Sequence, residues 1–172
     1  MTMRTWKNTL FLDAMPGRQK VGRGSGDFDL WQQEMTENGI ATVVCLTPEE
    51  SIQAESPEYA AWRKRQYGFG RYELIDLPVD DFRAPEPFVA GRFWRQAKQV
   101  ARKIEAGEKV FVHCGAGIGR TGMFAVAVLM QIGYTYDEAY REIEAIGSNP
   151  ETPAQQAFLQ NGPKEEDARN ER

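Results

Sequence analysis

One short stretch of this sequence holds most of the side chains that can carry out covalent chemistry. It runs from His113 to Gly122 as HCGAGIGRTG, and it contains the only histidine and one of the two cysteines of the chain. A cysteine attacks as a thiolate, and a nearby cation or a helix N-terminus lowers its pKa. Five residues separate Cys114 from Arg120. We therefore interpret Cys114 as a nucleophile and Arg120 as the cation beside it.

The residues between this cysteine and this arginine are suited to binding an anion through the backbone. Three of them are glycines, which tolerate the positive φ angles of a loop whose amide N–H groups turn inward. The guanidinium of Arg120 is a planar fork that can bind two phosphoryl oxygens at once. The predicted phosphate-binding set is Gly115, Ala116, Gly117, Ile118, Gly119 and Arg120.

Two neighbouring residues have supporting roles in this interpretation. The hydroxyl of Thr121 can donate a hydrogen bond to the sulfur of Cys114, which would stabilise that sulfur as a leaving group. His113 is placed to brace the loop through its ring nitrogens rather than to attack a substrate.

A strand and a helix must position this loop. Residues 109–112 (KVFV) are a short apolar run that predicts a buried strand. Residues 123–132 are apolar on all sides except at Gln131, as expected of a central buried helix. The loop would then lie at a helix N-terminus, where the helix dipole favours bound anions.

Two nucleotide-binding motifs fit the same loop less well. Residues 117–122 match the GxGxxG dinucleotide fingerprint, but that fingerprint needs a second strand ending in an acidic residue. Residues 135–146 have helical spacing at that position instead. A Walker-type loop requires a lysine before Thr121, where this chain has Arg120.

The run His113-Cys114-x5-Arg120-Thr121-Gly122 resembles the signature loop of the cysteine-dependent protein tyrosine phosphatases. The dual-specificity branch, near the kinase-associated and regenerating-liver phosphatases, fits best. The resemblance extends over roughly residues 9–160, because three further segments fall in the order that such domains use: Met15-Pro16-Gly17, residues 39–44 and residues 77–81.

The resemblance implies roles for two further side chains. In the register of the family, Asp81 is the proton donor to the leaving group, with Asp80 as the alternative, and adjacent carboxylates raise one another's proton affinity. A glutamine in the register of Gln155 orients the hydrolytic water in several relatives. Gln155 also stands three residues after Thr152, where it would complete a helix cap, so both interpretations of this glutamine stay open.

The alternation of strand and helix patterns predicts an α/β fold. We expect a single domain over residues 1–162, with a central, mainly parallel sheet, helices on both of its faces and a helical C-terminal part. Residues 1–8 are expected to be loose, and residues 163–172 to form a charged disordered tail. The other predicted elements are strands at 9–12, 41–46 and 71–77, and helices at 27–38, from 57 with Ser56 as its cap, at 86–106, from 135 and from 152.

Composition bounds the remaining possibilities. With 172 residues, 41% hydrophobic content, a net charge of −4 and a pI near 5.2, the chain predicts a globular domain without general affinity for nucleic acid or anionic membranes. Two cysteines and no signal-like N-terminus favour a reducing cytoplasm. We interpret Cys45 as a core residue. We expect a monomer, with no metal or organic cofactor.

The predicted activity is a two-step phosphatase reaction through a phosphocysteine on Cys114. Loop positions 115, 116 and 118 carry no lysine or arginine, whereas relatives that act on phosphoinositides tend to have basic residues there. A phosphorylated protein or peptide is therefore favoured as substrate, with phosphotyrosine first and phosphoserine or phosphothreonine second. The alternatives are a phosphatase of a small molecule or lipid, such as an inositol phosphate, a phosphoinositide or a nucleotide, and a non-catalytic phospho-binding module.

Overall fold

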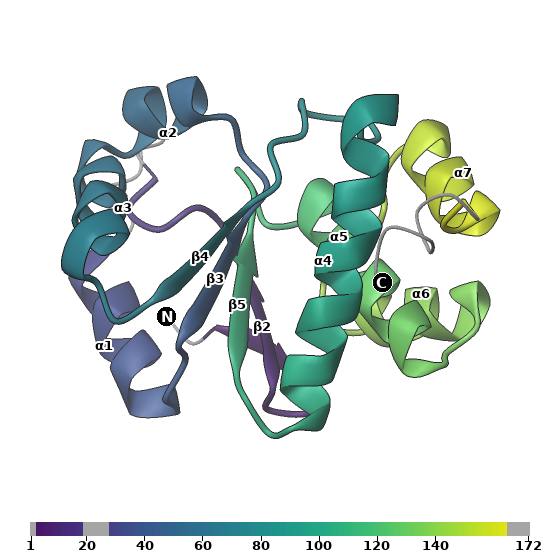
Figure 1. Ribbon diagram of the computed structural model, residues 1–172, viewed down its shortest axis with the longest axis horizontal. Helices are drawn as coiled ribbons and strands as arrows, with labels where there is room; N and C mark the ends of the chain where they lie inside the picture. Colours follow the sequence, from purple (N-terminus) through teal and green to yellow (C-terminus); the bar gives the residue numbers. More distant parts are fainter. Residues whose placement is uncertain (1–2, 19–27, 165–172) are drawn as a thin grey trace.

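A single mixed sheet organises the computed structural model, which describes residues 3–18 and 28–164 (Figure 1). Within these residues the sheet has five strands in the order β1-β2-β5-β3-β4. Only β1 is antiparallel to its neighbour, and the other pairs are parallel. The strands are β1 Arg4–Trp6, β2 Leu10–Asp13, β3 Thr42–Cys45, β4 Glu73–Asp76 and β5 Val110–His113.

Helices lie on both sides of the sheet, as the sequence predicts. In Figure 1, α1, α2 and α3 lie to the left of the strands, and α4, α5, α6 and α7 lie to the right. The helices after β5 make the C-terminal part helical, so the predicted fold class is confirmed. The helices are α1 Phe28–Asn38, α2 Glu49–Glu55, α3 Pro57–Phe69, α4 Pro87–Glu105, α5 Gly119–Ile132, α6 Tyr136–Glu144 and α7 Pro153–Asn161.

Alternating residues of the central strands fill two hydrophobic cores. In β5, Val110 and Val112 pack into the core on the side of α4 and α5. Phe111 points to the other face and packs with Trp31 and Tyr59 of α1 and α3. This alternation follows from the two-residue period of a strand. Helix α5 is buried from Gly119 to Leu129, which confirms the central buried helix.

The sheet topology places three loops at one edge. Strand β5 pairs in parallel with β2 and with β3, so that Asp13, Cys45 and His113 are in register at the carboxyl ends of their strands. The segments that follow them, 14–18, 46–48 and 114–118, therefore leave the sheet side by side. Ligands of open α/β sheets bind at this edge.

The expectation that residues 1–8 are loose is wrong for residues 3–8, while residues 1–2 lie outside the described residues. Residues 4–6 form β1, and a tight turn follows in which Lys7 and Asn8 have φ angles of 49° and 55°. Trp6 is 8% exposed and donates a hydrogen bond from Nε1 to Glu142 Oε2 at 3.0 Å. A three-residue strand is too short to show a periodic pattern, so this hairpin gave no recognisable signal.

The helix caps are partly as predicted. Thr135 and Thr152 form complete capping boxes with Glu138 and Gln155. Helix α3 begins at Pro57, but Ser56 makes no side-chain cap; its hydroxyl instead donates to the carbonyl of Pro16 at 2.7 Å. Helix α2 was not anticipated.

At the C-terminal end, α7 finishes at Asn161. Of the predicted tail, residues 165–172 lie outside the described residues. No described helix is long and apolar enough to span a membrane.

Candidate active site

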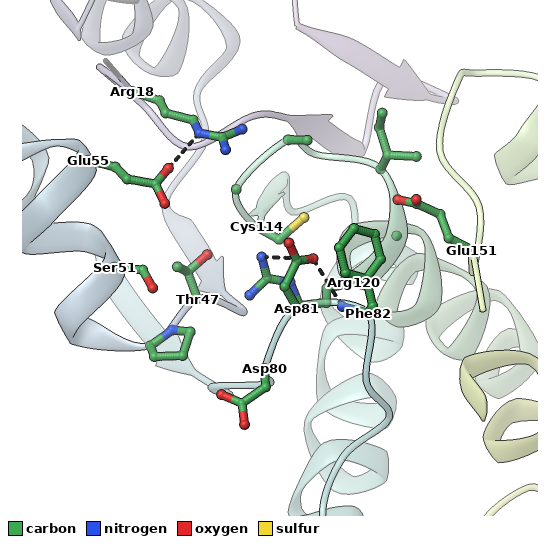
Figure 2. A pocket seen from close by; sticks show the side chains of 15 residues that line it. Arg18, Thr47, Ser51, Glu55, Asp80, Asp81, Phe82, Cys114, Arg120 and Glu151 are labelled. Atoms are coloured by element: carbon green, nitrogen blue, oxygen red, sulfur yellow. Dashed lines mark hydrogen bonds and ion pairs between the residues drawn. The ribbon is translucent and has the colours of Figure 1, made fainter. Parts of the chain in front are cut away.

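A cavity of about 260 Å³ lies at the carboxyl edge of the sheet, and Cys114 lines it (Figure 2). The segments that meet there follow β2, β3, β4 and β5, together with part of α2 and the residues before α7. Its lining residues include Arg18, Thr47, Ser51, Glu55, Asp80, Asp81, Phe82, Cys114, Arg120 and Glu151.

The loop after Cys114 depends on glycine at its tip. Gly117 has a φ angle of +76°, which favours glycine. A Cβ at this position would also lie 2.3 Å from the carbonyl carbon of Asp13 and 2.4 Å from its oxygen. Any larger residue would therefore push the loop away from the end of β2.

The carbonyl groups of this loop are held from outside the pocket. Gly117 O accepts a hydrogen bond from Arg4 Nη2 at 2.6 Å and another from Ser148 Oγ at 2.7 Å. Arg4 Nη1 in turn donates to Ser148 Oγ at 2.8 Å and to Gly147 O at 2.7 Å. Because these bonds hold the carbonyls, they favour a loop conformation in which the amide N–H groups face a ligand in the pocket. Two further bonds of this kind join Met15 N to Gly115 O at 3.0 Å and Asn149 N to Ile118 O at 3.2 Å.

Arg120 connects this loop to the loop that follows β4. Its side chain is buried, and Nη1 donates to the carbonyl of Val79 at 2.8 Å. Its Nη2 lies 3.4 Å from Asp81 Oδ1 and also 3.4 Å from the point where a Cβ on Gly115 would stand. Within the described part of the chain, Arg120 Nε is buried without a hydrogen-bond partner. The guanidinium therefore has donor capacity left for an anion beside Cys114.

The two candidate acids differ in orientation. Asp81 points toward Arg120 and Cys114 in Figure 2, and its Oδ1 also accepts a hydrogen bond from Phe82 N at 3.0 Å. Asp80 points away from the sulfur. Phe82 has a φ angle of 62°, a strained conformation for a residue with a side chain, and it turns the chain directly after Asp81.

His113 braces the loop through both ring nitrogens. Its Nδ1 lies 3.1 Å from the carbonyl of Cys114, which can only accept, so Nδ1 carries the proton. Its Nε2, 2.6 Å from the hydroxyl of Tyr59, must then accept from that hydroxyl. Burial lowers the pKa of His113 to about 3, so the imidazole is neutral and is not the cation beside the sulfur.

The hydroxyl of Thr121 is buried and has no hydrogen-bond partner among the residues that the structure describes. Cys45, in contrast, lies in the core with its sulfur donating to the carbonyl of Thr47 at 3.6 Å. Burial raises the pKa of the Cys45 thiol to about 12, which makes this thiol unreactive.

Gln155 lies outside the pocket lining, and both polar atoms of its amide make hydrogen bonds to the backbone. Its Oε1 accepts from the backbone N–H of Glu151 at 2.8 Å, and its Nε2 donates to the carbonyl of Arg83 at 3.1 Å. The helix-cap interpretation of Gln155 is confirmed. The carboxylate that lies against the loop is that of Glu151, whose Oε1 is 2.6 Å from the position of a Cβ on Gly119.

Sequence reasoning missed several residues of this site. Arg4 and Ser148 hold the loop from distant parts of the chain, and only the fold brings them there. Arg18, Thr47 and Glu151 follow or precede predicted elements without any motif of their own. No group of three or more potential metal-binding side chains occurs within residues 3–18 and 28–164.

Comparison with known proteins gives a family match and a set of structures with this fold. The family model PTP-SAK, described as "Swiss Army Knife protein, DSP-PTPase phosphatase domain", matches residues 31–161. No curated protein matches significantly.

Among solved structures, a kinase associated phosphatase with its catalytic-site cysteine replaced by serine has a TM-score of 0.74 and 15% identity, covering 88% of this chain and 84% of that chain. Tk-PTP in its active form has a TM-score of 0.63 and 24% identity, covering 89% of this chain and 90% of that chain. PTPMT1 in complex with PI(5)P has a TM-score of 0.67 and 20% identity, covering 90% and 89%. At these identities the structures show a shared fold.

Proposed function

This chain belongs to the Swiss Army Knife DSP-PTPase family, in the dual-specificity branch of the cysteine-dependent phosphatases, and from this premise we propose that it dephosphorylates proteins through a phosphocysteine on Cys114. Phosphotyrosine is the first substrate class, and phosphoserine and phosphothreonine are the second. The observation that carries the proposal is that Cys114, Arg120 and Asp81 line one pocket at a helix N-terminus.

In the first step, the thiolate of Cys114 attacks phosphorus in line with the leaving oxygen. The sulfur–phosphorus bond forms as the phosphorus–oxygen bond breaks, and Asp81 gives its proton to the departing oxygen. Asp81 is the better candidate because it faces the sulfur, whereas Asp80 faces away.

In the second step, the ionised Asp81 takes a proton from a water molecule that attacks the phosphocysteine. The sulfur–phosphorus bond breaks, inorganic phosphate leaves, and the thiolate is restored. The unpartnered hydroxyl of Thr121 is available to donate to the sulfur as the negative charge returns to it. We keep water positioning by Gln155 as a hypothesis, although its engaged amide favours a structural role.

Through both steps, the amides of residues 115–120 and the guanidinium of Arg120 hold the equatorial phosphoryl oxygens. Phosphoryl transfer leaves the protein mainly positioning and charge stabilisation to supply. These donors are fixed before substrate arrives, because the loop carbonyls and Arg120 are already anchored. His113 donates to the carbonyl of Cys114, and the hydroxyl of Tyr59 holds His113 in that position.

The pocket supports a phosphoprotein more than a polyphosphorylated lipid. Its lining contains four carboxylates and two arginines, and both arginines are paired with carboxylates: Arg18 with Glu55 and Arg120 with Asp81. A ligand with several phosphates would face net repulsion from such a wall.

A substrate panel tests this proposal. Phosphotyrosine, phosphoserine and phosphothreonine peptides are compared with phosphoinositides, inositol phosphates and nucleotides by phosphate release. We expect the highest kcat/KM with a phosphopeptide. A higher value with a phosphoinositide would favour the lipid alternative, which the PI(5)P complex of PTPMT1 keeps relevant. Binding without turnover would favour the non-catalytic module.

We also propose that residues 1–162 make up the phosphatase domain, now with β1 as part of it. Its two free cysteines, both buried, are compatible with the reducing cytoplasm that the sequence suggests. We also propose that the protein acts as a monomer.

A further inference from the structure

One wall of the pocket carries a second arginine that the proposed reaction does not use. Arg18 follows β2, and Figure 2 shows its guanidinium pointing from Glu55 toward the loop after Cys114. Arg18 Nη1 lies 3.7 Å from the point where a Cβ on Gly115 would stand, and Arg120 Nη2 lies 3.4 Å from the same point. Two guanidinium groups therefore flank one residue of the phosphate-binding loop.

Only part of the Arg18 guanidinium is engaged. Its Nε donates to Glu55 Oε2 at 2.6 Å. Its Nη1 is buried and has no hydrogen-bond partner within the described part of the chain. A buried donor without a partner is uncommon in native proteins. Where such a donor lines a pocket, a bound ligand can accept the missing hydrogen bond. The salt bridge to Glu55 holds the guanidinium so that it extends from Glu55 toward the loop after Cys114 (Figure 2).

A second unpartnered donor lines the same cavity. Thr47 follows β3 and is 5% exposed, and its hydroxyl is buried without a hydrogen-bond partner in the residues described. Ser51 of α2 lies beside it in Figure 2. Arg18, Thr47 and Ser51 thus give the α2 side of the pocket a cation and two hydroxyls, outside the set that holds the phosphoryl group.

We propose that Arg18, supported by Thr47, forms a second anion-binding subsite that takes an acidic side chain next to the phosphorylated residue of a peptide substrate. This inference rests on the proposed function and narrows its substrate class. A guanidinium binds a carboxylate through hydrogen bonds from its N–H groups, and the unpartnered Nη1 of Arg18 supplies one such donor. The negative charge of Glu55 beside the Arg18 guanidinium repels a dianionic phosphate more strongly than a singly charged carboxylate, and so favours the carboxylate.

The test compares two phosphotyrosine peptides that differ only in glutamate or glutamine next to the phosphotyrosine, on each side in turn. Dissociation constants are measured by fluorescence anisotropy with Cys114→Ser protein, so that binding is read without turnover. With the acidic residue on one of the two sides of the phosphotyrosine, we expect the glutamate peptide to bind about tenfold more tightly than the glutamine peptide. This is the size expected of a charge-assisted hydrogen bond to a partly exposed arginine.

In the same Cys114→Ser background, Arg18→Gln should reduce the glutamate preference to below about twofold. Arg18→Lys should keep part of it, because the charge remains while the fork is lost. Arg102→Gln makes the same charge change on an exposed position of the last turn of α4 and should leave the preference unchanged. Thermal unfolding of each variant shows whether the fold is retained, and the lysine variant keeps the test valid if the glutamine variant does not fold.

Three outcomes overturn the proposal. A glutamate preference that is absent, or that persists in Arg18→Gln, means that Arg18 does not read an acidic neighbour. If Arg18→Gln weakens binding of a short-chain bisphosphorylated phosphoinositide while the peptide ratio stays near one, the subsite serves lipid phosphates. Turnover of an aryl phosphate by protein with Cys114 intact tests the proposed phosphatase activity separately, because that substrate has no neighbouring acidic group.

Discussion

The Nη1 atom of Arg120 donates a hydrogen bond to the carbonyl oxygen of Val79, 2.8 Å away. This bond joins the arginine of the phosphate-binding loop to the segment that carries Asp81 before any substrate is present. The arginine is therefore fixed in both position and orientation, which removes much of the reorganisation that binding a phosphoryl group would otherwise require.

Replacing Arg120 by lysine should lower kcat/KM for an aryl phosphate by roughly 10²–10³, because an ammonium cannot bind Val79 and two phosphoryl oxygens together. Steady-state kinetics measure this loss. Arg102→Lys, the same exchange on the exposed surface of α4, is the control and should behave as wild type. Equal activity of Arg120→Lys and the wild-type protein would contradict the role of the planar Arg120 guanidinium in binding the phosphoryl oxygens.

Replacing Cys114 by serine should abolish turnover of an aryl phosphate, because a hydroxyl at neutral pH is a far weaker nucleophile than a thiolate. Binding of vanadate or a phosphopeptide should remain, since the loop amides and Arg120 are unchanged. Cys45→Ser is the matched control for loss of a thiol, and it should retain activity. Turnover near the wild-type level in Cys114→Ser would refute the nucleophile assignment.

Asp81→Asn should slow hydrolysis of alkyl phosphates by roughly 10²–10⁴ and affect good phenol leaving groups less, because only poor leaving groups depend strongly on protonation. The basic limb of the pH–rate profile should flatten. Asp80→Asn makes the same change one residue earlier and should have a small effect. If the two effects are reversed, Asp80 is the acid.

The buried imidazole of His113 should make stability depend on pH. Its pKa is lowered from 6.5 to about 3 in the folded state, so between these values the unfolded chain binds the extra proton. This residue's contribution to stability is therefore fully present above pH 6.5 and is lost toward pH 3, by about 1.4 kcal/mol per pH unit.

Since His113 is the only histidine, its ring Hε1 proton gives a single identifiable NMR signal. The chemical shift of this signal should stay constant from pH 8 to about pH 4.5 in the folded protein. Urea unfolding at pH 7 and pH 5 measures the loss of stability. A shift that titrates near pH 6.5 would show that the ring is accessible and that the brace is absent.

Gln155→Glu tests whether Gln155 holds the segment that carries Asp81, through its hydrogen bond to the carbonyl of Arg83. The substitution keeps the acceptor for the N–H groups of Glu151 and Thr152, but it replaces the donor to the carbonyl of Arg83 with an oxygen that repels it. We expect kcat to fall about tenfold with alkyl leaving groups, as a loosened proton donor predicts. If Gln155 instead positions water, phosphocysteine should accumulate, which a burst of alcohol release in rapid-mixing kinetics would show.

Motifs with a fixed spacing allowed much of this site to be predicted. Cys114, Arg120 and the glycines between them belong to one loop, so their proximity follows from the sequence alone. The strand before them and the buried helix after them were visible in the hydrophobic pattern. Asp81 depended on a family register, and the structure places it beside Arg120.

The contacts that hold the loop were outside the reach of sequence patterns. Arg4 and Ser148 meet Gly117 because β1 lies at the edge of the sheet and the chain after α6 returns beside it, and neither residue has a distinguishing local context. Ser56 shows a related limit: its place before Pro57 favours a cap, but tertiary contact with Pro16 takes its hydroxyl.

The bond between Arg4 and Gly117 gives the hairpin at residues 4–13 an unexpected importance for anyone preparing this protein. An expression tag that disturbs β1, or a protease that trims it, would release the carbonyl of Gly117 from its anchor without touching a single reactive side chain. Such a preparation would keep its thiol and its overall helical content while losing turnover. The intact mass of an inactive sample should therefore be measured first, because it shows whether β1 has been trimmed.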